Sequence, residues 1–344
     1  MQSKVLLIYT GGTIGMNRNP ATGALEPFDF EHLLQRVPEL EQFDTKIDTY
    51  QFVPPIDSSD MSPRLWTDLS HVIADHYEGY DGFVVLHGTD TMAYTASALS
   101  YLLENLTKPV VFTGSQLPIG QLRTDGKENL ITSIEIAAAK DVDGRAMVPE
   151  VGIYFGGHLL RGNRTTKQSA DEFNAFESFN YPHLVEAGVN ITYHRHRMLT
   201  PDFSRPMKPH FRLDNNVIIF SLFPGISDDL IRHIIHTPNL RAIVMRTFGS
   251  GNAPQNPWLL QALKEGTRAG KVIVNISQCM QGTVEMGRYD TGYHLQEAGV
   301  VSGHDSTVES AVTKLMFLQS HYDDPDRIRQ LMNQSIRGEI TVRA

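Results

Sequence analysis

The sequence predicts an α/β fold with two α/β domains. The larger N-terminal domain has a mostly parallel sheet flanked by helices, and the smaller C-terminal domain has a parallel sheet. Short β-branched runs alternate with longer amphipathic stretches, which is typical of parallel strands joined by crossover helices. The chain has 344 residues, and two cores are expected because single hydrophobic cores stop growing at about 250–300 residues.

The N-terminal domain is predicted over residues 1–199. Its predicted strands are apolar enough to be covered on both faces and span 4–10, 49–53, 82–87, 109–113 and 151–155. Ser62 followed by Pro63 is an N-cap with proline at the first helical position, and Asp90 or Thr91 can cap a later helix. The predicted helices span 63–77, a stretch ending at 103, and 128–140.

Residues 200–216 are predicted to be a linker, because Pro201, Pro206 and Pro209 interrupt any helix there. The alternation of strand and helix patterns then resumes over the C-terminal domain, 217–344. Its predicted strands span 217–222, 242–246 and 271–276, and its predicted helices span 228–236, 257–269, 307–319 and 325–336.

Composition excludes several classes of protein. The 30 basic and 39 acidic side chains leave a formal net charge of -9 without a basic block, so nucleic acid is not an expected partner. No run approaches the roughly 18 apolar residues of a membrane span, and the run 5–9 is too short for a signal peptide. The single cysteine, Cys279, cannot close an intrachain disulfide, which fits a reducing compartment. A cytoplasmic protein is therefore expected.

Polar segments follow the predicted strands at their carboxyl ends, where open α/β sheets bind ligands. Segment 10–15 reads Thr-Gly-Gly-Thr-Ile-Gly, in which glycines let backbone amides approach a ligand and threonines offer a hydrogen bond or a nucleophile. Segment 87–91 reads His-Gly-Thr-Asp-Thr, in which a hydroxyl beside a carboxylate can orient water or substrate at a helix N-terminus. Taken singly, the first also fits a glycine turn and the second a helix cap.

Two further segments carry candidate binding or catalytic groups. Segment 56–61, Ile-Asp-Ser-Ser-Asp-Met, suits the ammonium and carboxylate of an amino acid, although it equally fits a solvated turn. Segment 161–167, Arg-Gly-Asn-Arg-Thr-Thr-Lys, places Lys167 close to two arginines. A lysine that loses its proton in such surroundings can accept one from a hydroxyl or water. The alternative interpretation is an exposed basic loop.

Other catalytic motifs are missing from the sequence. It contains no G-x-S-x-G nucleophile elbow, no G-x-x-x-x-G-K-[ST] phosphate loop and no H-E-x-x-H zinc motif. Segment 10–15 also lacks the G-x-G-x-x-G of a dinucleotide site, so no cofactor or metal is expected. Cys279 follows an apolar strand, where a lone cysteine is usually buried and inert rather than nucleophilic.

Together, segments 10–15 and 87–91 resemble the two signatures of bacterial-type L-asparaginases. The resemblance covers nearly the whole chain, because it extends through 57–61, 113–116, 161–167 and 251–256. With no signal peptide apparent, the chain is most similar to the cytoplasmic type I enzymes. The family implies cofactor-free hydrolysis of asparagine to aspartate and ammonia.

The resemblance also implies a catalytic set. Thr13 would be the nucleophile on the first loop and would form an acyl-enzyme, while Thr89, Asp90 and Lys167 would assist proton transfer or activate water. Whether Thr13 or Thr89 attacks first stays open. A hydroxyl is a weak nucleophile at neutral pH and needs a base, and the tetrahedral oxyanion needs donors such as the backbone amides of the two threonines.

Substrate binding and assembly are implied in the same way. Ser58 and Asp90 would hold the α-carboxylate and α-ammonium of the amino acid, with Asp57 and Ser59 in support. The family commonly forms a tetramer built as a dimer of dimers, so a homodimer or homotetramer is expected. Asn252 falls in the segment that reaches into the neighbouring site.

The first loop departs from the family pattern. Many relatives carry a tyrosine there as the partner of the hydroxyl, whereas residues 17–27 contain none. Tyr289 matches a tyrosine that some type I relatives supply from the second domain, and it is the predicted replacement. Arg246 and Cys279 match positions implicated in cooperative activation by asparagine at a second, regulatory site.

The leading hypothesis is therefore a cytosolic asparaginase. A glutaminase-asparaginase, or an amidotransferase component acting on a glutaminyl group, would use the same scaffold. The missing loop tyrosine leaves open a third function, that of a catalytically weak amino-acid-binding sensor.

Overall fold

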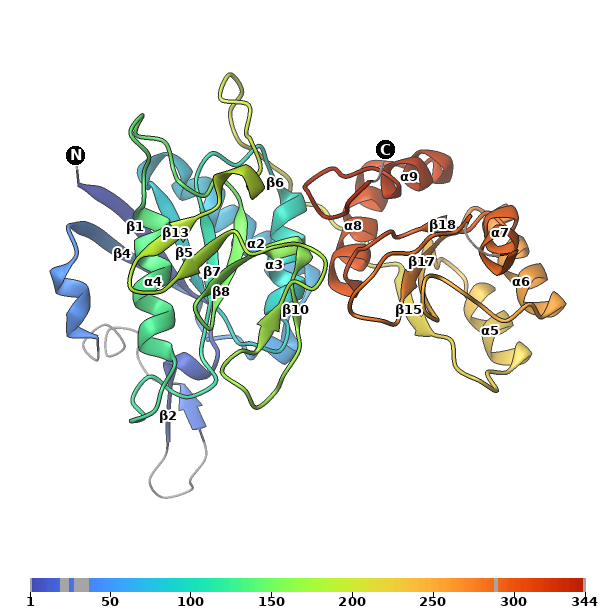
Figure 1. Cartoon of the computed structure of the whole chain (residues 1–344), viewed down its shortest axis with the longest axis horizontal. Coiled ribbons are helices and arrows are strands. Elements are labelled where there is room, and N and C mark those ends of the chain that lie inside the picture. The colour runs from blue at the N-terminus through green and yellow to red at the C-terminus, as the bar shows by residue number, and fades with distance from the viewer. Residues whose placement is uncertain (1, 19–24, 28–36, 288–289, 343–344) are drawn as a thin grey trace. The chain divides into compact units, whose positions relative to one another are not determined.

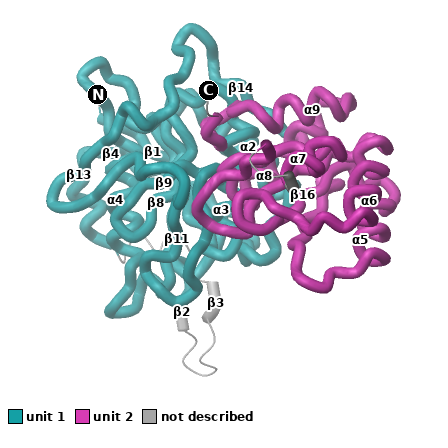
Figure 2. Tube along the Cα trace, turned by 45° about the vertical axis from the view of Figure 1, so that its right-hand side comes forward, with its two compact units in different colours: residues 1–211 teal, residues 212–344 magenta. Residues whose placement is uncertain are grey.

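The computed structural model describes residues 2–18, 25–27, 37–287 and 290–342. The chain folds into two compact units, Met1–Phe211 (unit 1) and Arg212–Ala344 (unit 2), which are coloured separately in Figure 2. Each unit has a sheet and packed helices, so the predicted α/β fold class is confirmed. None of the helices in the described ranges is long and apolar enough to cross a membrane.

Unit 1 is built on an eight-stranded mixed sheet (Figure 1). Across the sheet, the strands are β13 (Ile191–Tyr193), β12 (Val185–Ala187), β9 (His158–Arg161), β8 (Val151–Phe155), β7 (Val110–Thr113), β5 (Gly82–Leu86), β1 (Ser3–Tyr9) and β4 (Thr45–Gln51). Neighbouring strands run parallel from β8 to β4, whereas the pairings of β9, β12 and β13 are antiparallel. The expected mostly parallel sheet is confirmed, and the antiparallel edge is an addition to it.

One strand differs from its prediction. β4 was expected over 49–53 and covered on both faces, but it begins at Thr45, and its residues are half-buried or exposed. It lies at the edge of the sheet, where one side of the strand has no neighbour. The interior strands β5, β7 and β8 are buried throughout, as predicted.

The helices of unit 1 are α2 (Pro63–His76), α3 (Met92–Leu102) and α4 (Gly126–Ala138), and they occupy the predicted stretches. The Ser62 hydroxyl accepts a hydrogen bond from the backbone N–H of Leu65 at 3.5 Å, which confirms the predicted N-cap. Thr91 stands at the N-cap position of α3 without capping it, because its hydroxyl donates to the Ser58 carbonyl at 2.6 Å. That bond fastens the loop after β4 to the start of α3.

Short antiparallel pairs complete unit 1. They are β2 (Met16–Arg18) with β3 (Leu25–Pro27), β6 (Leu103–Glu104) with β14 (Lys208–Pro209), and β10 (Thr166–Lys167) with β11 (Phe176–Glu177). β14 lies within the predicted linker, and the Asn105 amide donates nearby to the carbonyls of Asp202 and Arg205 at 3.0 and 2.8 Å. Residues 202–209 therefore hydrogen-bond to the body of unit 1.

Unit 2 has a four-stranded parallel sheet in the order β15 (Val217–Ser221), β16 (Ala242–Thr247), β17 (Val272–Ser277) and β18 (Val301–Ser302). Its helices are α5 (Asp228–Ile235), α6 (Pro257–Arg268), α7 (Asp290–Glu297), α8 (Val308–His321) and α9 (Pro325–Met332). The strand β18 and the helix α7 were not predicted. The last helix ends four residues earlier than predicted, and the Glu339 carboxylate then accepts the backbone N–H of Ile336.

Candidate active site

Two glycines let the loops that follow β1, β4 and β5 come into close contact. Gly12 has φ 96° and ψ 171°, and a Cβ built there would lie 2.5 Å from the backbone nitrogen of Gly88. A Cβ built on Gly88 would lie 2.5 Å from the Ser58 hydroxyl oxygen. Any larger residue would separate the loops, so the glycines of segments 10–15 and 87–91 bring the threonine and serine segments together.

Thr13 begins a short 3-10 turn over Thr13–Gly15 and is half-buried. The turn is anchored to the core, because Ile14 is fully buried and the Tyr9 hydroxyl donates to the Gly15 carbonyl at 3.3 Å. Burial raises the pKa of Tyr9 to about 12, so its phenol stays protonated and remains a donor. The backbone around Thr13 is thus supported by the core of unit 1.

Lys167, Thr89 and Asp90 meet although they come from distant parts of the chain. The Lys167 side-chain nitrogen lies 2.9 Å from the Thr89 hydroxyl oxygen and 2.7 Å from a carboxylate oxygen of Asp90. Lys167 is 19% exposed at its side chain and Asp90 is 66% exposed, so the cluster opens to solvent on its carboxylate side. A hydroxyl, an amine and a carboxylate in this order can pass a proton from one to the next.

The segment before Lys167 is buried, so the alternative interpretation as an exposed basic loop is wrong. The Arg161 guanidinium pairs with the Glu150 carboxylate at 2.6 Å and donates to the Arg197 carbonyl at 2.8 Å. Glu150 also accepts the backbone N–H of Leu199 at 2.8 Å. These buried contacts fix the strand and turn from which Lys167 projects.

The segment after β4 presents a mixture of buried and exposed polar groups. Ser58 is 4% exposed, whereas Asp57 and Ser59 are exposed. The Asp57 carboxylate accepts both the backbone N–H and the hydroxyl of Ser59, each at 2.9 Å. These two hydrogen bonds lower the pKa of Asp57, so an ionised carboxylate stands beside the Gly88 loop at neutral pH.

Gln116 supports this cluster, and the sequence analysis did not assign it a role. Its side-chain amide N–H groups donate to the carbonyls of Ala170 and Glu172 at 3.1 and 3.0 Å, which turns its carbonyl oxygen towards the Thr89 hydroxyl, 3.5 Å away. Its own backbone N–H donates to the Asp125 carboxylate at 2.9 Å. The sequence did offer a signal, since Gln116 lies in a segment that matched the family pattern, but the two carbonyls that orient its side chain are 54 and 56 residues away in the sequence.

His87 is a second supporting residue without a predicted role. Its Nδ1 lies 2.7 Å from the Gly88 carbonyl oxygen, and its Nε2 lies 2.9 Å from the Thr95 hydroxyl, which accepts the Trp66 indole N–H at 3.0 Å. Burial lowers the pKa of His87 to about 4, so the ring is neutral. We infer that Nδ1 carries the proton and donates to Gly88, while Nε2 accepts from Thr95. This chain fixes the orientation of the Gly88 peptide.

The remaining predicted residues belong to unit 2. Asn252 closes a tight turn, with its backbone N–H and carbonyl both bonded to Phe248 at 2.8 and 2.9 Å. The buried Asn275 side chain donates to the carbonyl of Gly251 at 3.0 Å and so holds this turn. Tyr289 lies outside the described residues.

Arg246 and Cys279 come close at the carboxyl ends of β16 and β17. The Gln278 amide donates to the Arg246 carbonyl at 3.0 Å, and Cys279 follows directly. The expectation that Cys279 is buried is wrong, because it lies in the exposed turn beyond the end of β17. The Arg246 Nε is buried without a hydrogen-bond partner in the described structure.

The fold and the site together define an α/β protein of two units that holds a threonine–lysine–aspartate cluster at the carboxyl edge of a sheet. Within the described ranges, no three His, Cys, Asp or Glu side chains converge as a bound metal would need. The chain belongs to the asparaginase family. The family model for "Asparaginase, N-terminal" matches residues 4–199, and the one for "Glutaminase/Asparaginase C-terminal domain" matches residues 216–332.

Individual relatives agree with this assignment. "L-asparaginase 1" of Escherichia coli K12 is 44% identical over 351 residues, covering 99% of this chain and 99% of that protein. The crystal structure of L-asparaginase I from Vibrio cholerae superposes with a TM-score of 0.90 at 40% identity, covering 99% of this chain and all of that one. A component of the glutamyl-tRNA(Gln) amidotransferase from Sulfolobus acidocaldarius is 32% identical, covering 98% of this chain and 76% of that protein.

Proposed function

We propose that this protein hydrolyses L-asparagine to L-aspartate and ammonia through a threonyl acyl-enzyme. The observation that carries the proposal is the Lys167 nitrogen, 2.9 Å from the Thr89 hydroxyl and 2.7 Å from Asp90, beside the glycine contact that brings the Thr13 loop to the Thr89 loop. The family assignment and the relatives named L-asparaginase support the substrate.

In the first half-reaction, the Thr13 hydroxyl oxygen attacks the side-chain amide carbon of asparagine. The hydroxyl proton passes to a base and then to the amide nitrogen, which leaves as ammonia when the carbon–nitrogen bond breaks. The oxyanion of the tetrahedral intermediate is stabilised by the backbone N–H groups of Thr13 and Thr89, which sit on adjoining loops. Tyr289 is our candidate for the base, because its sequence context matches that of a family tyrosine.

In the second half-reaction, water attacks the ester that joins the aspartyl group to Thr13. As a neutral amine, Lys167 can take the Thr89 proton directly, since the two atoms are at hydrogen-bond distance, and Thr89 takes a proton from the water. Asp90 then stabilises the resulting ammonium. The tetrahedral intermediate collapses when its carbon–oxygen bond to Thr13 breaks, the proton held by Lys167 returns through Thr89 to the Thr13 oxygen, and aspartate leaves. The reverse assignment, in which Thr89 attacks first with Lys167 as its base, uses the same contacts and is an outcome of the test below.

The substrate is held by the polar loop that follows β4. We assign the α-carboxylate to Ser58 and the α-ammonium to Asp90, with Asp57 and Ser59 in support. The ionised state of Asp57 and the contact of Ser58 with the Gly88 loop support this assignment. We further propose a homodimer or homotetramer in which Asn252 completes the site of a neighbouring subunit.

The test is ammonia release from millimolar asparagine by wild type, Thr13→Ala and Thr89→Ala, combined with intact-mass detection of an aspartyl adduct. We expect wild type to turn over, Thr13→Ala to form no adduct, and Thr89→Ala to accumulate the adduct on Thr13. An adduct on Thr89 would reverse the roles of the two threonines. Thermal stabilisation by asparagine without ammonia release from wild type would overturn catalysis in favour of an amino-acid sensor.

A second candidate is a glutaminase or an amidotransferase component. It is favoured by the 32% identity to a protein named as a subunit of an amidotransferase, because a similar sequence then occurs in a protein with a different named function. Comparing kcat/KM for asparagine and glutamine separates the two functions, and a higher value for glutamine would replace our first proposal.

We also propose that asparagine binds a regulatory site at Arg246 and Cys279. The buried Arg246 Nε without a partner is suited to a ligand carboxylate. The exposed free thiol supports a reducing, cytoplasmic location. A sigmoidal dependence of rate on asparagine, made hyperbolic by Arg246→Met, is the expected result, and an unchanged curve in that variant would exclude this role.

A further inference from the structure

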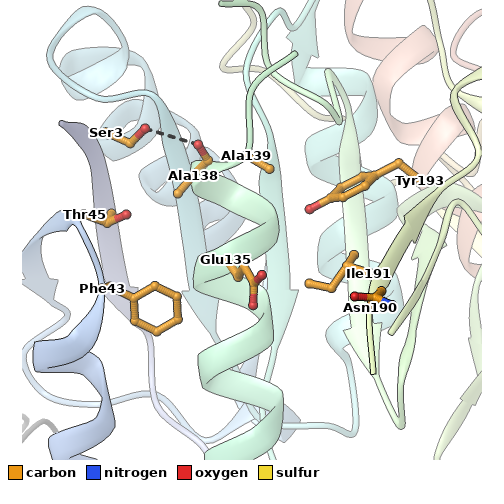
Figure 3. Close-up of a pocket in the computed structure, with 9 residues that line it drawn as sticks. All are labelled: Ser3, Phe43, Thr45, Glu135, Ala138, Ala139, Asn190, Ile191 and Tyr193. Carbon is orange, nitrogen blue, oxygen red and sulfur yellow. Dashed lines mark hydrogen bonds between the residues drawn. The ribbon is translucent and has the colours of Figure 1, made fainter. Parts of the chain in front are cut away.

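A pocket lies in unit 1 at the end of the sheet opposite to the candidate active site. It has a volume of about 470 Å³ and is lined by Ser3, Phe43, Thr45, Glu135, Ala138, Ala139, Asn190, Ile191 and Tyr193 (Figure 3). Ser3 and Thr45 are the first residues of β1 and β4, whereas the catalytic loops follow the last residues of the strands. The seven residues of β1 separate the two sites by about 20 Å.

The pocket contains polar groups without partners in the described structure. The Glu135 carboxylate and the Tyr193 hydroxyl make no hydrogen bond or ion pair with any described residue, and both side chains line the pocket (Figure 3). Two turns earlier on α4, Glu128 shows the contrasting arrangement, since its carboxylate accepts the hydroxyls of Tyr154 and Thr132. On this face of α4, Glu128 is hydrogen-bonded to a tyrosine, whereas Glu135 and Tyr193 are not hydrogen-bonded to each other.

The charges around the pocket favour a cation. Glu135 carries the only carboxyl group among the nine lining residues, and none of those residues is basic. Ala138 ends α4, so the negative end of the helix dipole adds to the carboxylate. Lys4 and Lys46 follow the lining residues Ser3 and Thr45 in β1 and β4, so they point to the opposite face of the sheet. Lys140, two residues beyond the end of α4, pairs with Asp81 at 2.9 Å.

The apolar side chains that line the pocket favour a cation that is attached to a hydrocarbon group. Phe43 and Ile191 face each other on either side of the Glu135 side chain, as Figure 3 shows. Burial raises the pKa of Tyr193 to about 12, so its hydroxyl stays protonated and neutral. An aromatic ring beside a carboxylate suits an ammonium group attached to a hydrocarbon chain. A ligand carboxylate would find no cation here, so asparagine and aspartate do not fit.

We propose that this pocket binds a small aliphatic amine without a carboxylate, whose ammonium group pairs with Glu135 and whose chain lies between Phe43 and Ile191. The Tyr193 hydroxyl then supplies a second polar contact to the amine. Because the groups involved are separate from the catalytic loops, binding does not depend on asparagine turnover.

The test is isothermal titration of the full-length protein with 1,4-diaminobutane at low salt, with 1-butanol as a neutral ligand of similar length. We expect saturable millimolar binding of the diamine and none of the alcohol. Glu135→Gln should weaken binding at least tenfold, and Tyr193→Phe should weaken it a few-fold. The matched control is Asp143→Asn, which removes an equal charge from the exposed turn after α4 and should leave the affinity unchanged.

Four results would overturn the proposal. The first three are the absence of saturable binding to wild type, equal affinity in wild type and Glu135→Gln, and an equal loss in the Asp143→Asn control. The fourth is competition by asparagine, because it would place the diamine in the catalytic site. Melting temperatures of the variants within a degree of wild type show that a lost signal reflects the pocket and not unfolding.

Discussion

The contact between Gly12 and Gly88 makes a sharp prediction about catalysis. In Gly12→Ala, the new methyl carbon would lie 2.5 Å from the Gly88 nitrogen, whereas ordinary contacts begin at 3.4 Å, so the loops must move apart. The separation is about 1 Å, and a misplacement of that size costs about 100-fold in rate. Alanine held at the φ 96° and ψ 171° of Gly12 also adds a strain of about 1–3 kcal/mol to the folded state.

A matched control separates strain from misplacement. Gly144 also has a positive φ, 76°, but a Cβ built there meets nothing within 4 Å. Gly144→Ala should therefore lose stability of the same order, about 1–3 kcal/mol, and keep its activity. The assay is kcat/KM for asparagine by ammonia release, alongside urea unfolding. Full activity in Gly12→Ala, or an equal loss of activity in both variants, would refute the reasoning.

Three further predictions concern the groups around this contact. Lys167→Met should lower kcat about 10²–10⁴-fold without loss of fold, as measured by ammonia release and circular dichroism, and a near-normal rate would remove Lys167 from the mechanism. Glu150→Ala removes the carboxylate that balances the buried charge of Arg161 and should cost about 3–5 kcal/mol in urea unfolding. Asp48→Ala, which removes the partner of the exposed Lys46, should cost less than about 1 kcal/mol. His87 binds a proton only near pH 4 in the folded state and near 6.5 in the unfolded chain, so acidification through this window should destabilise the fold by about 1.4 kcal/mol per pH unit. His87→Gln should flatten that part of the stability curve, and a slope equal to that of wild type would contradict the assignment.

Local patterns were sufficient to predict the buried strands and capped helices. The strand β8 spans the predicted 151–155, because five consecutive apolar residues have no amphipathic alternative. The helix α2 follows from Ser62 and Pro63 alone. The antiparallel strands β9, β12 and β13 were missed because they are three or four residues long and pair through contacts that no local period reveals.

In the candidate site, too, local sequence patterns predicted some features, and others depend on contacts between distant residues. Its motif residues could be named from the sequence because glycine, threonine and aspartate cluster after predicted strands. The burial of Arg161 could not be predicted, since it depends on Glu150 in another strand connection and on a carbonyl of residue 197. The role of Gln116 likewise depends on carbonyls at 170 and 172. Such partners are specified by the tertiary fold and not by spacing along the chain.

The hydrogen bonds between residues 202–210 and the rest of unit 1 limit how the gene can be divided. The His210 backbone N–H donates to the Leu102 carbonyl at 2.7 Å, and the same histidine ring contacts Glu104 at 2.9 Å. A fragment that stops at the first proline of this stretch would expose those acceptors together with the pairing edge of β6. If the two units are produced as separate polypeptides, the chain should therefore be divided after Phe211, so that residues 202–210 stay in the same polypeptide as the rest of unit 1.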